Sequence, residues 1–235
     1  MNRRTSTALA IVTVVLVVVC GCTQLSSTRS SSSTTPATHM TETTIALPAP
    51  TATTAPAPPP PTTAAPAPPT GIQIGPGAQA YAVQPQPAPG SCHYTYIGPD
   101  PLPDPHCTPG AVDPQVTQAD IGSTICSSGF TSTIRPPESV TEPEKAASAA
   151  AYGYSGSFHV AEYDHLIPLE LGGDPNDPAN LWVEPPDNPN ATSFVNTKDQ
   201  LENRLNSLVC SGQLSLAAAQ QAIASNWVIA YQTYG

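Results

Sequence analysis

The clearest pattern of apolar and polar residues lies between residues 155 and 185. An apolar segment, SFHVAEYDH, runs to His165, a loop with the pair Gly172–Gly173 follows, and a second apolar segment, NLWVEP, begins at Asn180. Short apolar runs bounded by Gly, Pro and Asn are typical of β-strands, and glycine permits a tight connection between them. The pattern therefore predicts two strands joined by a Gly-rich loop.

The segments after these strands have helical spacing. Thr197 and Gln200 are placed as a capping box at the start of a helix that Gly212 should end. Apolar residues recur along this helix at three- and four-residue intervals, at Leu201, Leu205, Leu208 and Val209. A last helix is predicted over SLAAAQQAIASNWVIAYQ. Its expected core-facing residues are Leu216, Ala219, Ile223 and Trp227.

Three further elements are expected ahead of the strands. VTQADIGSTIC, with a cap signal at Thr117, predicts a short helix, and GFTSTIRPP predicts a strand that its prolines end. Thr141 and Glu144 form a second capping box before an Ala-rich helix, which Gly153 and Gly156 should stop. These elements predict an α+β domain in which additional helices surround a small two-stranded core.

Residues 1–21 have the features of an export signal. Arg3 and Arg4 precede an uncharged run that is too short to span a membrane but has the length of a signal-peptide core. The run ends in Val-Cys-Gly-Cys, which resembles a lipobox, so cleavage would leave a lipid-modified Cys22 at the N-terminus. An ordinary signal peptide with two incidental cysteines is the alternative. We expect a lipid-anchored protein on the outer face of the cytoplasmic membrane.

Residues 22–90 are expected to be a disordered tether. The segment consists mainly of Ser, Thr, Pro and Ala, and cannot bury a core that would offset the entropy of ordering it. Its prolines favour extended polyproline II structure, at about 3.1 Å per residue. Such a spacer would let the domain reach into the cell wall; a low-complexity product of a GC-rich genome is the alternative. The remaining residues, 91–235, have the length of one domain.

Four cysteines lie in the expected domain, Cys92, Cys107, Cys126 and Cys210. An even number in an exported chain favours disulfides over metal ligation, and the CxxC pairs of zinc sites are absent from the sequence. Three pairings are possible. We favour Cys92 with Cys107, across a Pro-rich loop, and Cys126 with Cys210, which would join the segment ahead of the strands to the helix after them.

Asp164 and His165 are the strongest candidates for chemistry. An aspartate offers a hard oxygen ligand for a divalent cation, and histidine is the side chain whose ordinary pKa allows proton transfer near neutral pH. Side by side in an apolar segment, the two residues suit metal-assisted hydrolysis. A surface pair without chemistry is the alternative.

The same region resembles the HNH, or ββα-metal, nuclease family. The family pattern is an acid-His pair, an apolar-Pro turn, a Gly-rich loop, an Asn that begins the second strand, and a ligand at the start of a helix. The matching residues are Asp164–His165, Pro168, Gly172–Gly173, Asn180–Leu181 and Asn196. The resemblance covers about residues 155–210, with the final His of the family name absent, and the flanking sequence is similar to small exported HNH-type proteins of actinobacteria.

The resemblance implies a metal-dependent endonuclease with Mg²⁺, or alternatively Mn²⁺, as cofactor. Asp164 and Asn196 would hold the cation, and His165 would deprotonate the attacking water. Asn180 would orient that histidine. For Asn180 the alternative is a turn residue, and for Asn196 it is a plain helix-start residue.

Other polar residues are weaker candidates. Arg135 and Lys198 are expected to contact phosphate, although single cations on a domain are usually solvated. Glu162 and Asp199 are possible additions to the metal shell, whereas Glu202 is expected to cap the helix or pair along it.

The charge balance argues against tight binding of nucleic acid. The chain has 17 Asp and Glu, and only 5 Lys and Arg remain once Arg3 and Arg4 leave with the signal. Non-specific affinity for DNA depends on cationic contacts that release counterions. We therefore expect weak, metal-dependent binding of nucleic acid, with DNA favoured over RNA, and nothing in the sequence indicates a protein partner. The alternative function is an HNH-like envelope lipoprotein that has lost catalysis and serves as a binding or structural module.

Overall fold

The computed structural model describes residues 71–194 and 196–235. The expected signal peptide, the lipidation site Cys22 and the first part of the expected tether lie outside the described residues and stay predictions. Within the described part of the chain, no helix is long and apolar enough to cross a lipid bilayer. The fold there is of the α+β class, with small two-stranded sheets and four α-helices.

The two strands expected around the Gly-rich loop are present. β5 (Glu162–His165) and β6 (Leu181–Glu184) pair in antiparallel fashion, with Asp164 opposite Trp182. The 3-10 turn η1 (Leu169–Leu171) lies in the connecting loop. The pair places the acid-His dipeptide at the end of a strand, next to the loop.

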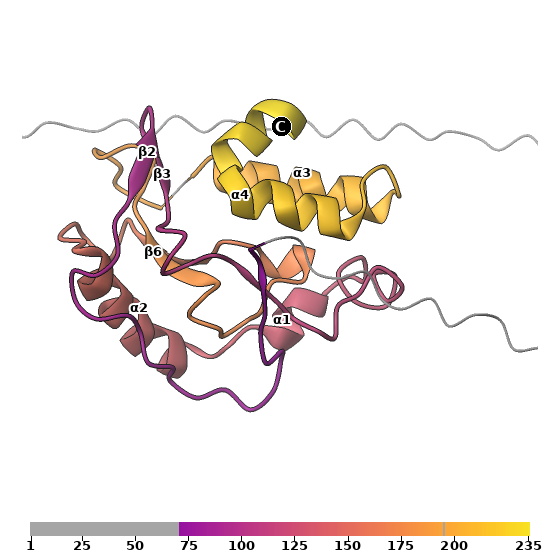
Figure 1. Ribbon diagram of the computed structural model, residues 1–235, viewed down its shortest axis with the longest axis horizontal. Coiled ribbons are helices and arrows are strands. Elements are labelled where there is room, and N and C mark those ends of the chain that lie inside the picture. The colour runs from indigo at the N-terminus through magenta and orange to yellow at the C-terminus, as the bar shows by residue number, and fades with distance from the viewer. Residues whose placement is uncertain (1–70, 195) are drawn as a thin grey trace, which may run out of the picture. The chain divides into compact units, whose positions relative to one another are not determined.

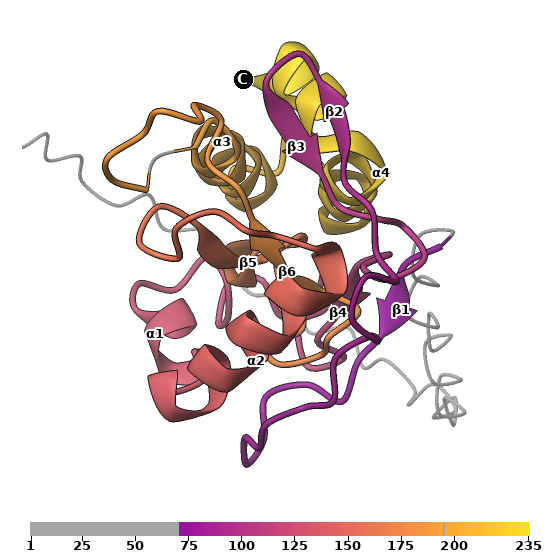
Figure 2. The ribbon, with the colours of Figure 1, turned by 90° about the vertical axis from the view of Figure 1, so that its left-hand side faces the viewer.

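Helices lie on both sides of this strand pair. α2 (Glu138–Tyr152) packs against β5 and β6 on one side, and α3 (Lys198–Cys210) and α4 (Leu216–Tyr234) lie together on the other (Figures 1 and 2). All four residues of β6 are buried. A strand that is covered on both faces is expected to be apolar throughout, so the carboxyl group at the end of β6, on Glu184, is an exception that needs partners.

α2 begins earlier than its capping signal predicts. The residue before the helix is Pro137, so Thr141 lies inside the helix and the predicted capping box is not formed. Glu144 is fully buried, and its carboxylate accepts a hydrogen bond from the backbone N–H of Gln84 at 2.6 Å. Gly153 ends the helix, as predicted, in the left-handed conformation (φ +64°) that glycine adopts without strain.

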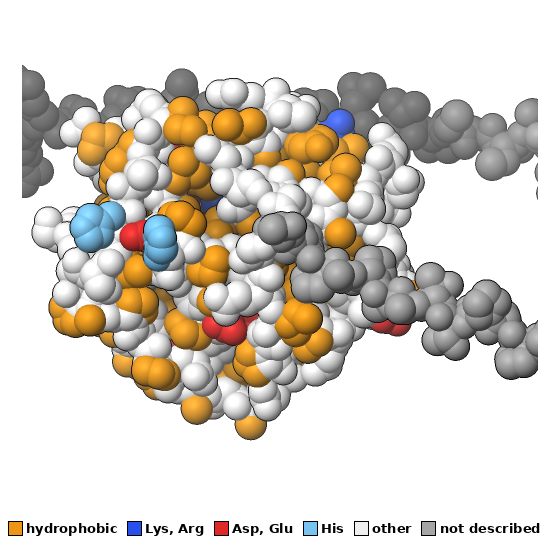
Figure 3. All heavy atoms as spheres, in the orientation of Figure 1, with side chains coloured by type: hydrophobic (Ala, Val, Ile, Leu, Met, Phe, Trp, Pro, Cys, Tyr) orange, Lys and Arg blue, Asp and Glu red, His pale blue; other side chains and the backbone are white. Residues whose placement is uncertain are grey.

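Charged side chains are sparse on the face shown in Figure 3, where hydrophobic side chains are scattered among polar ones. This surface follows from the composition, because only 10% of the residues are charged. The large hydrophobic side chains that stay exposed in the described residues are Ile74, Val83, Tyr96, Ile97, Phe158 and Ile229. Such scattered exposure is ordinary for a folded domain.

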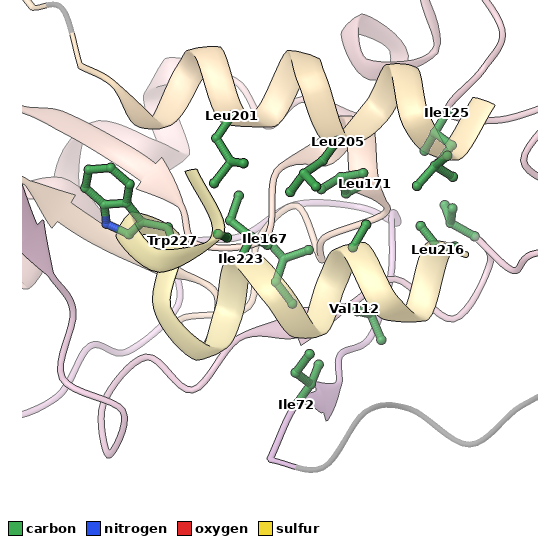
Figure 4. Close-up of a cluster of buried hydrophobic side chains, with 14 of the residues drawn as sticks. Ile72, Val112, Ile125, Ile167, Leu171, Leu201, Leu205, Leu216, Ile223 and Trp227 are labelled. Carbon is green, nitrogen blue, oxygen red and sulfur yellow. The ribbon is translucent and has the colours of Figure 1, made fainter. Parts of the chain in front are cut away.

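The main hydrophobic core lies between α3, α4 and the loop that follows β5 (Figure 4). The predicted core positions of both helices are buried, namely Leu201, Leu205, Leu208, Val209, Leu216, Ala219, Ile223 and Trp227. Ile167 and Leu171 from the loop pack among them. Trp227 also donates its indole N–H to the carbonyl of Pro101, in β3 (Asp100–Leu102), at 2.8 Å. The helical spacing in the sequence therefore identified the core-facing sides of both helices.

The helix expected over residues 116–126 is absent, and the segment forms consecutive turns. The hydroxyl of Thr117 donates to the carboxylate of Asp120, and the hydroxyls of Ser123 and Thr124 donate to the Asp120 carbonyl. Polar side chains that bond nearby backbone in this way compete with a regular helix. The prediction of a helix here was wrong.

The strand expected over GFTSTIRPP is also absent, because α1 (Phe130–Ile134) occupies this segment. The hydroxyls of Ser132 and Thr133 donate to carbonyls three residues earlier, at 2.7 Å each. These short-range bonds require a helical turn, and Ile134 is buried at its end. Side-chain bonding thus overrode the β-propensity of the segment.

β5 is shorter than the apolar segment that predicts it. Residues 157–161 turn instead of extending, and the Lys145 ammonium from α2 donates to the carbonyls of Phe158 and Ala161 at 3.0 and 2.8 Å. These bonds take the place of strand pairing. His159 is therefore exposed and lies outside the sheet.

The start of the domain lies earlier than the boundary expected near residue 90. β1 (Gln73–Ile74) pairs in parallel with β4 (Ala111–Val112). The backbone N–H of Gly77 then donates to the buried carboxylate of Asp174 at 2.7 Å. Residues 71–90, which were expected to belong to the tether, are thus held by backbone bonds to the domain. Their high content of Pro, Gly and Ala concealed this, because hydrogen bonds from backbone groups leave no trace in composition.

Both favoured disulfides are confirmed. Cys92 bonds Cys107, and Cys126 bonds Cys210. The first closes the segment that contains the hairpin of β2 (Thr95–Ile97) and β3. The second joins the turns ahead of α1 to the last residue of α3.

We predict that a protein starting at residue 71 will be as stable as the full chain, whereas one starting at residue 91 will be strongly destabilised. The shorter protein would lose β1 and the burial of Ile72. It would also remove the backbone N–H groups that Asp174 Oδ2 and Glu144 Oε1 accept. Each buried group left unsatisfied costs about 1–3 kcal/mol. Urea unfolding followed by tryptophan fluorescence measures the difference. Equal unfolding midpoints would show that residues 71–90 do not belong to the domain.

Candidate active site

Asp164 and His165 are the last two residues of β5, and each residue is 7% exposed. Successive side chains of a strand point to opposite faces, so the two groups meet different surroundings. Asp164 contacts Lys198 of α3, and His165 contacts Pro175 in the loop between the strands. The pair can therefore divide its roles between charge and proton transfer.

The imidazole of His165 is held in one tautomer. Its Nε2 lies 3.0 Å from the carbonyl oxygen of Pro175. A carbonyl oxygen only accepts hydrogen bonds, so Nε2 must carry the hydrogen and the neutral ring keeps its lone pair on Nδ1. Burial lowers the pKa of His165 to about 4, and the charge of Asp164 offsets this only in part. The ring is therefore neutral at physiological pH, with Nδ1 ready to accept a proton.

Asn180 holds the loop that carries Pro175. The side chain is fully buried, and its Nδ2 donates to the carbonyls of Ile167 and Asp174 at 3.0 Å each. Its Oδ1 accepts the backbone N–H of Ile167 at 3.0 Å. Asn180 thus acts on His165 through the loop backbone and makes no hydrogen bond with the imidazole.

Lys198 is the first residue of α3, and its side chain is fully buried. Its ammonium donates to Asp164 Oδ2 at 2.6 Å, to the backbone carbonyl of His165 at 2.8 Å, and to Glu202 Oε1. These three acceptors use all three hydrogens of the ammonium group. The expected contact of Lys198 with phosphate is therefore not available in this structure.

Glu184 adds a second carboxyl group to this cluster. It is fully buried at the end of β6, and neither carboxylate oxygen has a donor among the described residues. Burial and the neighbouring charge of Asp164 raise the pKa of Glu184 well above its usual value. A protonated Glu184 can donate to Asp164. Burial opposes the ionisation of Asp164 itself, but Lys198 holds the pKa of Asp164 below its usual value.

Each of the two expected metal ligands uses one side-chain oxygen for another bond. Asn196 Oδ1 accepts the backbone N–H of Asp199 at 2.9 Å, so Asn196 caps α3 in place of Thr197, which makes no capping bond. Asp164 Oδ2 is occupied by Lys198. In residues 71–194 and 196–235, no three His, Cys, Asp or Glu side chains converge in a way that could hold a metal ion. Asp164 and Asn196 do not fit a divalent cation in this arrangement.

Two pockets share Arg135, Glu162 and His165 in their walls. The larger, of about 360 Å³, extends towards Phe194. The smaller, of about 140 Å³, reaches Asp164 and further acidic side chains. His165 therefore borders space that a substrate can enter.

Arg135 is the cation best placed to meet an anion. Of the Lys and Arg side chains in the described range, Lys145, Lys198 and Arg204 all donate to protein oxygens. Arg135 is exposed and has no hydrogen bond or ion pair with any described residue. Its guanidinium can therefore form a bidentate contact with a phosphate group, as the sequence predicts.

Several acidic side chains that line the pockets have raised pKa values. Burial, together with the charges of Asp164 and Asp199, raises the pKa of Glu162 to about 7. Burial raises the pKa of Glu202 to about 8 despite its contact with Lys198. The pKa values of Glu170 and Asp199 are also raised, chiefly by burial. The site therefore carries less negative charge at neutral pH than its composition suggests.

Glu184 was not among the residues predicted from the sequence, and Lys198 was predicted to contact phosphate, whereas it contacts Asp164 and Glu202. A signal for Glu184 was present, because a carboxyl group ends an otherwise apolar strand, opposite Glu162 in the pairing. The spacing of Lys198 and Glu202, four residues apart on one helix, also indicated the ion pair between them. Comparisons with protein-family models, curated proteins and solved structures found no match to this chain.

We predict that the imidazole of His165 will stay neutral, with its hydrogen on Nε2, down to a pH of about 4. Folding disfavours the charged ring, so the proton is taken up only well below the ordinary pKa of 6.5. Nitrogen-15 NMR of labelled histidine reports both the tautomer and the titration, and a His165→Gln variant assigns the signal. A ring that titrates near 6.5, or one with its hydrogen on Nδ1, would contradict the structure.

Proposed function

We propose that this protein is an extracytoplasmic endonuclease that hydrolyses phosphodiester bonds with His165 as the general base. The observation that carries the proposal is the state of the imidazole, whose Nε2 is bound to Pro175 while Nδ1 is left to accept a proton beside two pockets. The order of β5, β6 and α3 around it supports the resemblance to HNH nucleases. Export and lipid anchoring at Cys22 rest on the sequence alone.

In the proposed reaction, Nδ1 of His165 takes a proton from water while the water oxygen forms a bond to phosphorus. The bond from phosphorus to the leaving oxygen breaks, and that oxygen receives a proton from the carboxyl group of Glu162. A pKa of about 7 keeps Glu162 partly protonated near neutral pH. Arg135 pairs with the phosphate oxygens. Base, acid and phosphate contact thus come from residues that line the same two pockets.

The expected Mg²⁺ or Mn²⁺ takes no part in this proposed step, because Asp164 Oδ2 binds Lys198 and Asn196 Oδ1 binds the backbone of Asp199. The family resemblance implies a metal-dependent reaction, whereas the step proposed here predicts cleavage without added metal. The assay therefore includes both metals and a chelator.

Binding of nucleic acid is proposed to be weak, with only a shallow dependence on salt concentration. Lys and Arg side chains are scarce on the face shown in Figure 3, and Arg135 is the one cation near His165 that is free of protein partners in the described residues. Few cationic contacts release few counterions. The same acidic balance favours the second candidate, an envelope module without catalysis, in which the pockets bind a ligand and transform nothing.

We predict that His165→Ala will lower the rate of plasmid DNA or RNA cleavage by about two to four orders of magnitude, the usual contribution of a positioned general base. Gel assays and single-turnover kinetics measure the loss. His159→Ala is the matched control, because His159 is exposed and outside the sheet, and it should cleave at the wild-type rate. Equal rates in wild type and His165→Ala, or no cleavage by wild type, would favour the module without catalysis.

We predict a bell-shaped dependence of the rate on pH. The rate should rise as pH increases through about 4, where His165 loses its proton, and fall as pH increases through about 7, where Glu162 loses its own. Glu162→Gln should slow the reaction on the acidic side and remove the decline at higher pH. An unchanged decline in Glu162→Gln would show that another group is the acid.

A further inference from the structure

We infer that Lys198 is the resident cation of the Asp164–His165 site, occupying the position at Asp164 where the family resemblance places a divalent metal. The inference rests on where the ammonium lies. It touches the carboxylate of Asp164 and the backbone of His165, so it is in direct contact with both residues of the acid-His pair. No other Lys or Arg among the described residues is fully buried.

The surroundings of the ammonium resemble the oxygen shell of a bound cation. Its three acceptors are two carboxylates and one carbonyl, from Asp164, Glu202 and His165, and a fourth oxygen-bearing group, Glu184, interacts with the charges of Asp164 and Lys198. Oxygen ligands of this kind are those that Mg²⁺ and Mn²⁺ prefer. A metal ion could bind Asp164 Oδ2 here only by displacing the ammonium.

Two physical effects oppose a lysine in this position. Lys198 begins α3, where the positive end of the helix dipole disfavours a positive charge. Removal of its ammonium from water is also unfavourable unless it is paired and hydrogen-bonded. The carboxylates of Asp164 and Glu202 offset both effects, and their charges raise the pKa of Lys198 well above its usual value despite burial. The lysine is thus held as a permanent cation.

Lys198 acts as a positioning residue, because its hydrogens are all used within the protein and none remains for substrate. It neutralises Asp164, and its bond to the His165 carbonyl fixes the backbone that carries the base. Only those tests of this role that measure hydrolysis rest on the proposed function. The occupancy of the site by the ammonium can be tested without any activity.

The test measures Mn²⁺ binding, by electron paramagnetic resonance of free Mn²⁺, for the wild type, Asp164→Asn, Lys198→Ala and Arg204→Ala. In Lys198→Ala the carboxyl groups of Asp164 and Glu202, which contact the ammonium in the wild type, would border the space that it leaves. This variant should bind Mn²⁺ at least about tenfold more tightly than wild type, because the carboxylates lose their counter-charge. Arg204→Ala removes one positive charge from the exposed side of α3 and should bind Mn²⁺ as wild type does. Asp164→Asn should also leave wild-type binding unchanged.

A wild-type Mn²⁺ site that Asp164→Asn removes would overturn the inference, as would a folded Lys198→Ala variant with no gain in affinity. Should Lys198→Ala fail to fold, the comparison of wild type with Asp164→Asn decides by itself.

If the wild type cleaves nucleic acid, a chelator should leave its rate unchanged. Cleavage that needs Mn²⁺, combined with Mn²⁺ bound at Asp164, would refute the resident lysine and leave the proposed nuclease function intact. Absence of cleavage would refute that function and leave the Mn²⁺ result to decide on Lys198.

Discussion

The buried ammonium of Lys198 is the interaction on which the site depends. It joins β5 to α3 by bonding a side chain and a carbonyl of the strand while staying paired within the helix to Glu202. Loss of one partner of a buried ion pair typically costs about 3–5 kcal/mol, because the remaining charge is left without compensation. The relative position of strand and helix, and with it the place of His165, is therefore set by charge as well as by apolar packing.

The site contains more acidic side chains than cations, and protonation of some of the acidic side chains reduces the imbalance of charge. Asp164 is balanced by Lys198, but Glu162, Glu184 and Glu202 lie close by without enough cations to balance them. Burial and mutual repulsion raise their pKa values, so part of their charge is removed by protonation. The pKa values of the neutral His165 and the partly protonated Glu162 are shifted in opposite directions, which suits their proposed roles as general base and general acid.

The loop that orients the histidine depends on residues far away in the chain. Asn180 binds the loop at Ile167 and Asp174, and the carboxylate of Asp174 accepts the backbone N–H of Gly77. Residues 71–90 therefore help to hold the loop whose Pro175 carbonyl fixes His165. Residues 71–90 have the composition of a linker, yet they help to hold the site in place.

The sequence by itself determined the two strands and the core-facing sides of α3 and α4, because hydrophobic periodicity is a local property. An even number of cysteines indicated two disulfides, and the structure decided among the three possible pairings. The sequence also identified Asp164 and His165 as the candidate pair. Only the tertiary structure decided what those residues contact. Lys198 binds Asp164 although the two residues are 34 positions apart in the chain, and the side-chain oxygen of Asn196 caps the start of α3. The partners of a long side chain, and the burial that shifts its pKa, depend on how separate helices and strands pack together. A local sequence pattern does not contain this information.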